Sequence, residues 1–404
     1  MTLESSGRDR SFRDWVTGLR RWFHRHPEPS FEERATQAKV EEVLDELGIG
    51  HRRIAGTGVI ATIEGRAGGP VLALRADMDA LRIPEEPAGR EPDCISENPG
   101  VMHACGHDGH MAMLLGAGRL LQERRGELPG SVRLIFQPAE ETLPGGAARV
   151  IDEGGLHGVD AIVCLHLFGR APAGELRYRA GRFMAHTCDF DLTIRGRGGH
   201  HMCPQDCIDP MLIGARFVAS VQTDLATGLA PDRVYVLGFG TFASGTQYNQ
   251  TPETAHLSGS FRCFDEADAA AIERVMRTSL DGLVRQHTRP GAAPGYELTV
   301  KHGYPVLVND EAFSRRAAAV LGQRFRVSGG MDLNLGAEDF ARYLERVPGM
   351  FLFLGCLNPA KGITEINHSA RFDIDEAALV TGVDAYLALA QDYLAGPDRY
   401  RGPE

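Results

Sequence analysis

A thiol and an imidazole lie two positions apart in this sequence, at a spacing that suits the binding of a metal ion. Cys105 and His107 flank Gly106 in a loop just before a helical pattern. A thiolate and an imidazole are both good ligands for zinc and similar ions. Taken alone, such residues are more often a buried cysteine and a histidine that caps a helix. The pair therefore indicates a metal site only if further ligands meet it in the fold.

Two adjacent carboxylates follow an apolar run later in the chain. Glu140 and Glu141 come after Val132–Phe136 and a proline, where the alternative interpretation is a solvated acidic turn. Neighbouring carboxylates can divide the work of a metal enzyme, one as a ligand and the other as a general base. The two glutamates are thus candidates for both roles.

Histidines and aspartates complete the set of candidate residues. His166 follows an apolar run, where a lone histidine is more often a satisfied core residue, and His368 follows a glycine-containing turn. Asp77 and Asp79 follow Val71–Leu74 and could orient a ligand, position a water or cap the next turn. Each signal is weak alone. Together, one cysteine, three histidines and one or two glutamates are enough ligands for two metal ions.

The elements predicted around these residues are those of an α/β protein, in which helices flank a mainly parallel sheet. The predicted strands are Val59–Ile63, Val71–Leu74, Val132–Phe136, Ala161–Leu165 and Met350–Leu354. The predicted helices are Thr36–Leu47, Met111–Glu123, Glu311–Leu321 and Glu376–Leu394. Three of the strands run into aspartate, paired glutamate and histidine. Because ligands bind at the carboxyl ends of strands in open α/β sheets, sheet formation should bring these candidates together.

The middle of the chain has a different pattern, in the order strand, helix, two strands, helix, strand. Its predicted elements are Asp189–Arg195, Pro210–Leu225, Val234–Phe239, Ala255–Phe264, Glu266–Gln286 and Tyr296–Val300. This βαββαβ order predicts a ferredoxin-like domain, which we place at 187–304. The domain that carries the candidate ligands is then discontinuous and comprises 1–186 and 305–404.

Length, charge and cysteine usage limit the classes of function. The 404 residues suggest two domains, and the net charge of −11 argues against a nucleic acid or an anionic membrane as partner. No apolar run is long enough to predict a membrane span, and the N-terminal residues lack the apolar region of a signal peptide. The eight cysteines are scattered, so we expect no disulfide framework and a cytoplasmic protein.

Short motifs in a fixed order are spread over nearly the whole chain. They are Trp22–Glu28, Leu74–Leu81, Met102–His110, Gln137–Glu141, Asn249–Pro252, Gly336–Phe340 and Asn367–His368. In this order they resemble the M20 metallopeptidases, and within them the amidohydrolase subfamily of aminoacylase-like, hippurate-hydrolase-like and auxin-conjugate-hydrolase-like enzymes. The segment MHACGHDGH with a downstream QPAEE is highly specific for that family.

The resemblance implies a role for each matching residue. Cys105 would bridge two metal ions, and His107 and His166 would bind one each. Glu141 and His368 would complete the metal sites. Further roles are implied for residues that are not ligands: Glu140 as the general base, Asp79 as a support of the site, His200 as the lid residue that reaches the partner subunit's site, and Asn249 and Arg262 as the groups that hold the substrate carboxylate.

The resemblance also implies a reaction. It is the cleavage, with two divalent metal ions per subunit, of the amide bond in an N-acyl amino acid or a related small conjugate, which gives a carboxylic acid and an amino acid. The ligand types suit zinc or manganese and also admit cobalt or nickel. The inserted domain would be a lid that forms a homodimer.

Two alternatives stay open, a dipeptidase or aminopeptidase on the same scaffold and a metal-binding protein without catalysis. The chain departs from the family pattern at Gln205 and at the thiols Cys203 and Cys207, and this leaves the identity of the acyl group open.

Overall fold

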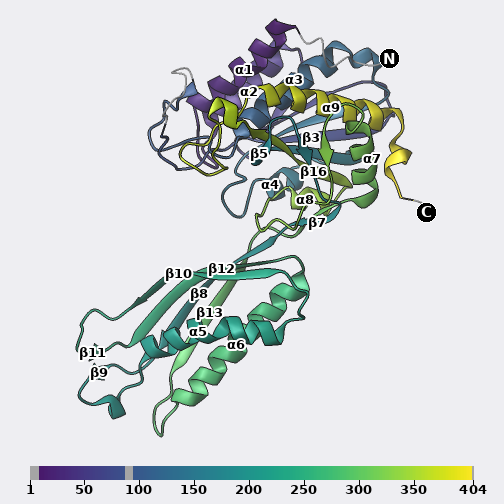
Figure 1. Ribbon diagram of the computed structural model, residues 1–404. Helices are drawn as coiled ribbons and strands as arrows, with labels where there is room; N and C mark the ends of the chain where they lie inside the picture. Colours follow the sequence, from purple (N-terminus) through teal and green to yellow (C-terminus); the bar gives the residue numbers. More distant parts are fainter. Residues whose placement is uncertain (1–8, 87–93, 403–404) are drawn as a thin grey trace. The chain divides into compact units, whose positions relative to one another are not determined.

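The chain folds into two compact units. The computed structural model describes residues 9–86 and 94–402 (Figure 1). Unit 1 lies within Met1–Phe183, Leu307–Asp332 and Glu338–Glu404, and unit 2 consists of Met184–Val306 and Leu333–Ala337. The boundaries predicted at 186/187 and 304/305 lie within three residues of these limits. Within the described ranges, no helix is both long and apolar enough to cross a membrane.

The short segment Leu333–Ala337 joins unit 2 although it is far from the rest of that unit in sequence. The backbone N–H of Ala185 lies 3.1 Å from the carbonyl oxygen of Asn334 and 2.8 Å from that of Gly336. No local pattern in the sequence signals this long-range pairing, so the sequence did not predict it.

An eight-stranded sheet organises unit 1, in the order β1-β2-β4-β3-β5-β16-β6-β15. The bounds are β1 (His51–Ile54), β2 (Gly58–Ile63), β3 (Val71–Asp77), β4 (Ser131–Gln137), β5 (Ala161–Pro172), β6 (Leu176–Arg177), β15 (Val327–Ser328) and β16 (Gly349–Leu357). The central strands β4, β3, β5 and β16 are parallel to one another, which confirms the predicted α/β class. Strands β1 and β2 run antiparallel at one edge. Strands β7 (Gly181–Met184) and β14 (Leu307–Asn309) pair separately.

Helices flank this sheet (Figure 1). They are α1 (Arg10–Arg25), α2 (Arg34–Glu46), α3 (His107–Glu123), α4 (Ala147–Asp152), α7 (Glu311–Leu321), α8 (Ala341–Leu344) and α9 (Ala377–Ala395). Short 3₁₀ turns are Arg125–Glu127, Pro204–Asp206, Pro359–Lys361 and Pro397–Tyr400. Helices α3 and α9 are the most deeply buried of the set, and they pack so closely that a Cβ atom at Gly382 would lie 2.0 Å from the sulfur of Met113.

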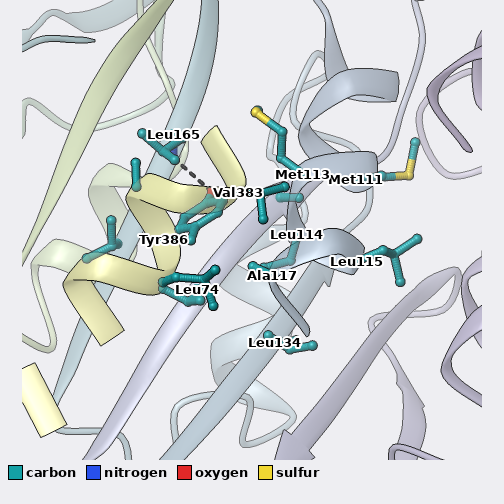
Figure 2. Close-up of a cluster of buried hydrophobic side chains, with 14 of the residues drawn as sticks. Leu74, Met111, Met113, Leu114, Leu115, Ala117, Leu134, Leu165, Val383 and Tyr386 are labelled. Carbon is teal, nitrogen blue, oxygen red and sulfur yellow. Dashed lines mark hydrogen bonds between the residues drawn. The ribbon is translucent and has the colours of Figure 1, made fainter. Parts of the chain in front are cut away.

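Tyr386 on α9 fixes this helix to the sheet at the level of the candidate site. Figure 2 shows Tyr386 beside Leu74 of β3 and Val383 of its own helix, in the same buried cluster as Leu114 of α3. The hydroxyl accepts the N–H of Leu165 at 3.0 Å and donates to the carbonyl of Arg75 at 2.9 Å. Strands β3 and β5 are thereby held at the positions from which Asp77 and His166 extend.

Unit 2 is a four-stranded antiparallel sheet in the order β10-β12-β8-β13, with two helices. Its elements are β8 (His186–Arg195), α5 (Pro210–Gly228), β10 (Tyr235–Ser244), β12 (Thr254–Cys263), α6 (Glu266–His287) and β13 (Gly295–His302), with β9 (Gly199–His200) paired to β11 (Gln250–Thr251). The chain order βαββαβ and this strand order are those of a ferredoxin-like fold, as predicted. Alternate residues of β8 enter the core because side chains along a strand alternate between its two faces.

Candidate metal centre

The predicted ligands of unit 1 come from four segments of the chain that meet at the carboxyl edge of the parallel sheet. Cys105 and His107 lie at the start of α3, Glu141 follows β4, His166 lies within β5, and His368 lies in the loop between β16 and α9. The parallel register pairs Asp77 with Gln137 at the end of β4, and it pairs Arg75 with Cys164, two residues before His166 in β5. The fold thus gathers residues that are up to 263 positions apart in the sequence, the separation of Cys105 and His368, whose loops are joined by the backbone N–H of His368 and the carbonyl of Ala104.

Ligand atoms of these residues lie at short distances from one another. The Cys105 sulfur is 3.4 Å from Nε2 of His166, and it also belongs to a group with His107 and Glu141 whose ligand atoms all lie within 4.8 Å. Oε1 of Glu141 lies 3.8 Å from Nε2 of His107 and 3.2 Å from Nε2 of His368. We call these five residues the catalytic cluster. The Cys105 sulfur thus lies near both His166 and Glu141.

Hydrogen bonds to the other ring nitrogen orient two of the histidines. Nδ1 of His107 lies 2.8 Å from the carbonyl oxygen of Asp79, and Nδ1 of His166 lies 2.8 Å from that of Leu167. Each Nδ1 must therefore carry the proton, which leaves the Nε2 lone pair directed into the cluster.

Two buried atoms in the cluster test whether a metal ion fits it. Within the described part of the chain, Nε2 of His107 and Oε1 of Glu141 are buried and have no hydrogen-bond partner. A buried polar atom without a partner costs free energy, and a cation between a ring nitrogen and a carboxylate oxygen would remove that cost. The donor set of thiolate, imidazole and carboxylate suits a zinc-like ion, so the residues fit the implied metal.

His110 also lies close to these residues but has a different role. Together with Asp77, it forms a group with His107 and His166 whose ligand atoms lie within 4.8 Å of one another. However, Nδ1 of His110 lies 2.5 Å from Oδ1 of Asp77, and its Nε2 accepts the N–H of Leu167 at 2.7 Å. Because both ring nitrogens are engaged, we assign His110 to positioning. The sequence reasoning did not single it out, although it belongs to the segment that contains Cys105.

Asp79 is the residue that connects the histidine loop to the paired glutamates. Its carboxylate accepts the backbone N–H of Glu140 at 3.0 Å and of Glu141 at 2.9 Å, as well as the hydroxyl of Ser30 at 2.6 Å. Burial raises the pKa of Asp79, but the hydrogen bond and charge of His107 outweigh it and hold the pKa below its usual value. An ionised Asp79 therefore fixes both glutamates relative to His107.

Glu140 lies among other buried carboxylates. One carboxylate oxygen of Glu140 lies within 4.8 Å of one oxygen each of Glu338 and Asp339, and all three residues are buried. Burial, followed by the charges of Glu338 and Glu141, raises the pKa of Glu140 well above its usual range. A carboxylate with a raised pKa is a stronger base, which suits a residue that takes a proton from water.

One buried arginine balances much of this negative charge. The Arg75 guanidinium lies 2.6 Å from Asp77, 3.0 Å from Glu338 and 2.9 Å from Asp339. Charges removed from water need partners of opposite sign, and Arg75 supplies one for three carboxylates at once. Neither Arg75 nor Glu338 was assigned a role from the sequence, because their partners come from distant segments.

His368 is held in an unusual backbone conformation. Its backbone φ of 69° is in the left-handed region, which residues other than glycine and asparagine rarely adopt. The backbone N–H of His368 donates to the carbonyl of Ala104 at 2.7 Å, and the side-chain amide of Asn367 donates to the carbonyls of Cys105 and Leu167 at 3.0 Å each. Asn367 thus ties the three segments that carry Cys105, His166 and His368.

The three residues predicted in the lid belong to unit 2 and do not all lie together in it. His200 pairs with Gln250 across β9 and β11, and the carbonyl of Asn249 accepts the N–H of His201 at 3.3 Å. Arg262 lies eight residues beyond the start of β12, where it donates to the carbonyl of Leu335 at 2.9 Å. Eight residues of extended strand span about 27 Å. His200 and Asn249 are therefore at one end of the unit 2 sheet and Arg262 is at the other.

Comparison with known proteins places the chain in a family. Residues 73–392 match the model of peptidase family M20/M25/M40. An N-acyl-L-amino acid amidohydrolase of Geobacillus stearothermophilus is 37% identical over 330 residues, which cover 81% of this chain and 87% of the relative. Thermostable carboxypeptidase 2 of Saccharolobus solfataricus is 36% identical over 380 residues, 93% of this chain and 95% of the relative.

A solved structure agrees with these matches. The YXEP protein of Bacillus subtilis, described as a dinuclear metal binding peptidase from the M20 family, is 33% identical and superposes with a TM-score of 0.82 over 96% of this chain and 99% of that one. The resemblance drawn from the motifs is confirmed, and the chain belongs to peptidase family M20/M25/M40.

Proposed function

We propose that this protein is an amidohydrolase that uses two divalent metal ions to cleave an N-acyl amino acid into a carboxylic acid and an amino acid. The observation that carries the proposal is the catalytic cluster, in which Cys105 contacts two groups of ligands beside the buried base Glu140. The name of the Geobacillus relative supports this substrate class. We take zinc or manganese as the metal, with cobalt and nickel as alternatives that the same ligands admit.

Cys105 is proposed as the bridging ligand, with His107, His166, Glu141 and His368 as the ligands around it. Metal ions bound by these residues would lower the pKa of a coordinated water and polarise the scissile carbonyl. The buried thiol of Cys105 has a pKa raised well above its usual value by burial and then by the charge of Glu141, so the thiolate needs a cation beside it.

The remaining steps fall to residues of the chain itself. Glu140 takes a proton from the attacking water and returns it to the leaving amine, while Asp79 keeps the glutamate backbone in place through its two N–H contacts. From the lid, His200 would donate to the oxyanion, and Asn249 and Arg262 would bind the substrate carboxylate.

The lid residues favour a homodimer in which each site is completed by the partner. Because His200 and Arg262 are at opposite ends of the unit 2 sheet, one lid could not present both to one small substrate. A second copy of the chain could supply the missing group. Mixing inactive Glu140→Ala and His200→Ala proteins should restore part of the activity. If subunits are shown to exchange and no activity returns, completion by the partner is wrong.

We also propose a cytoplasmic location, because the eight scattered cysteines have the usage expected of a reducing compartment.

The first experiment measures the substrate class. Metal-free protein is reloaded with zinc, manganese, cobalt or nickel and tested for amine release from N-acyl amino acids, dipeptides and longer peptides. Metal-dependent release from N-acyl amino acids is the expected result. Cleavage of peptides alone would favour the peptidase alternative, to which the name of the Saccharolobus relative points. Absence of all cleavage in protein that holds its metal would contradict the proposal.

A further inference from the structure

A second group of metal-binding residues lies in unit 2, outside the catalytic cluster. His186, Cys188 and His302 place their ring nitrogens and sulfur within 4.8 Å of one another. None of the three belongs to the motifs that carry the family resemblance, and none has a part in the proposed reaction.

Strand geometry explains why the three side chains meet. His186 and Cys188 are two residues apart at the start of β8 and therefore point to the same face of the sheet. His302, the last residue of β13, is the direct cross-strand partner of Cys188. Partners across an antiparallel pair have Cβ atoms about 4.5–5.5 Å apart, so all three side chains converge on one face.

The distances match those of a tetrahedral metal site. Nε2 of His186 lies 3.1 Å from Nδ1 of His302, and the Cys188 sulfur lies 3.1 Å from the first of these atoms and 3.4 Å from the second. Around a tetrahedral zinc ion, two nitrogen ligands are about 3.3 Å apart, and a nitrogen and a sulfur are about 3.6 Å apart. Shifts of a few tenths of an ångström would turn this triangle into three corners of such a site.

A backbone carbonyl already orients the buried histidine. Nδ1 of His186 lies 2.8 Å from the carbonyl oxygen of Tyr304, which requires the proton to be on Nδ1 and directs the Nε2 lone pair toward Cys188 and His302. Metal-binding histidines commonly donate their second ring N–H to such an acceptor. His186 and Cys188 are buried, whereas His302 is exposed and gives access from solvent.

We propose that His186, Cys188 and His302 form a zinc site with water at the fourth position. One thiolate with two imidazoles suits zinc, and a fourth ligand from water is compatible with the exposure of His302. The ion would join the first residues of β8 to the last residue of β13, close to the two limits of unit 2 at Met184 and Val306. Its effect would be to stabilise unit 2.

In the competing arrangement without metal, the Cys188 thiol and a His302 N–H simply donate to His186.

The test compares the zinc content of the full-length wild type with that of His302→Ala after equilibration with zinc and removal of excess metal. We expect the variant to hold one zinc fewer per chain, and Cys188→Ala to show the same loss. The control is His256→Ala, an exposed histidine of β12 in the same sheet that contacts the hydroxyl of Thr193, and its zinc content should equal that of the wild type. Because the result is a difference, it does not depend on how many ions the catalytic cluster holds.

Equal zinc content in the wild type and in His302→Ala would overturn the proposal. Since His302 is exposed, this variant should fold even if Cys188→Ala does not. A second measurement uses cobalt in a Cys105→Ala background, where Cys188 would be the thiolate that produces a cobalt–sulfur charge-transfer band. The band should appear there and be absent from Cys105→Ala/His302→Ala. No band in the single variant would also contradict the site.

Discussion

The two clusters of candidate metal ligands are built in different ways. In unit 1, the catalytic cluster draws its ligands from four separate segments of the chain, and a second layer of residues, including Asp79, His110 and Asn367, holds them. In unit 2, two neighbouring strands supply all three candidate ligands, and one backbone carbonyl orients His186. A site built from many segments should depend on residues that never touch a metal, whereas a site built from strand register should depend on little beyond its own ligands.

Replacement of Glu140, the proposed general base beside the catalytic cluster, has the largest expected effect. Replacing Glu140 by Gln removes the proton acceptor but keeps the size of the side chain, so we expect turnover to fall by about 10²–10⁴-fold or more with unchanged metal content. Amine release and metal analysis measure the two quantities. Glu141→Gln is the matched variant and should lose metal instead. Full activity of Glu140→Gln would mean that another group is the base.

Arg75 tests how far the catalytic cluster relies on its surroundings. In Arg75→Met, the carboxylates of Asp77, Glu338 and Asp339 lose a buried partner, and we expect the free energy of unfolding to fall by about 3–5 kcal/mol. Urea denaturation at neutral pH measures it. Arg53→Met removes an exposed pair with Glu41 and should leave stability nearly unchanged. Similar stability of both variants would show that the buried charges do not need Arg75.

Glu33 should make the stability of unit 1 depend on pH. This buried residue accepts the N–H of Ala139, next to Glu140, at 2.8 Å. Burial raises the pKa of Glu33 from about 4.5 to about 7, so the folded state holds the proton more tightly than the unfolded chain. The resulting stability is fully present below pH 4.5 and is lost as the pH rises through about 7, by at most about 3 kcal/mol.

Glu33→Gln should therefore remove this loss, and its stability relative to the wild type should rise between pH 4.5 and 7. Thermal unfolding across this pH range measures the difference. The exposed Glu64 provides the control, since Glu64→Gln should follow the wild type at every pH. Parallel curves for Glu33→Gln and the wild type would contradict the raised pKa.

A substitution of Asn367 distinguishes the metal affinities of the two clusters most directly, although its expected effect is the smallest. Loss of its amide in Asn367→Ala releases the loops of Cys105 and Leu167, and we expect the affinity of the catalytic cluster for metal to fall by about 10–100-fold. The zinc of unit 2 should be unaffected. Competition with a chelator measures both. Asn358→Ala, which removes a contact with Asp375 instead, is the control. Equal loss from both clusters would mean that the variant acts on the whole fold.

The sequence alone determined where β3, β4 and β5 lie and which candidate ligands follow their apolar runs, although β5 continues seven residues beyond its predicted end at Leu165. The apolar runs predicted β3, β4 and β5, and the residues that follow each run meet at one edge because parallel strands end on the same side. The βαββαβ order of unit 2 was likewise visible, since helical and strand periodicities are local properties.

Only the tertiary structure decided which histidines have hydrogen-bond partners at both ring nitrogens and which keep one nitrogen available to bind a metal ion. His107 and His110 look alike in sequence, yet only His110 has both ring nitrogens engaged, by Asp77 and Leu167. The convergence of His186 and Cys188 with His302 likewise depends on the pairing of β8 with β13, more than a hundred residues apart. Burial and long-range register arise when distant segments pack together, and no local pattern of residue types records them.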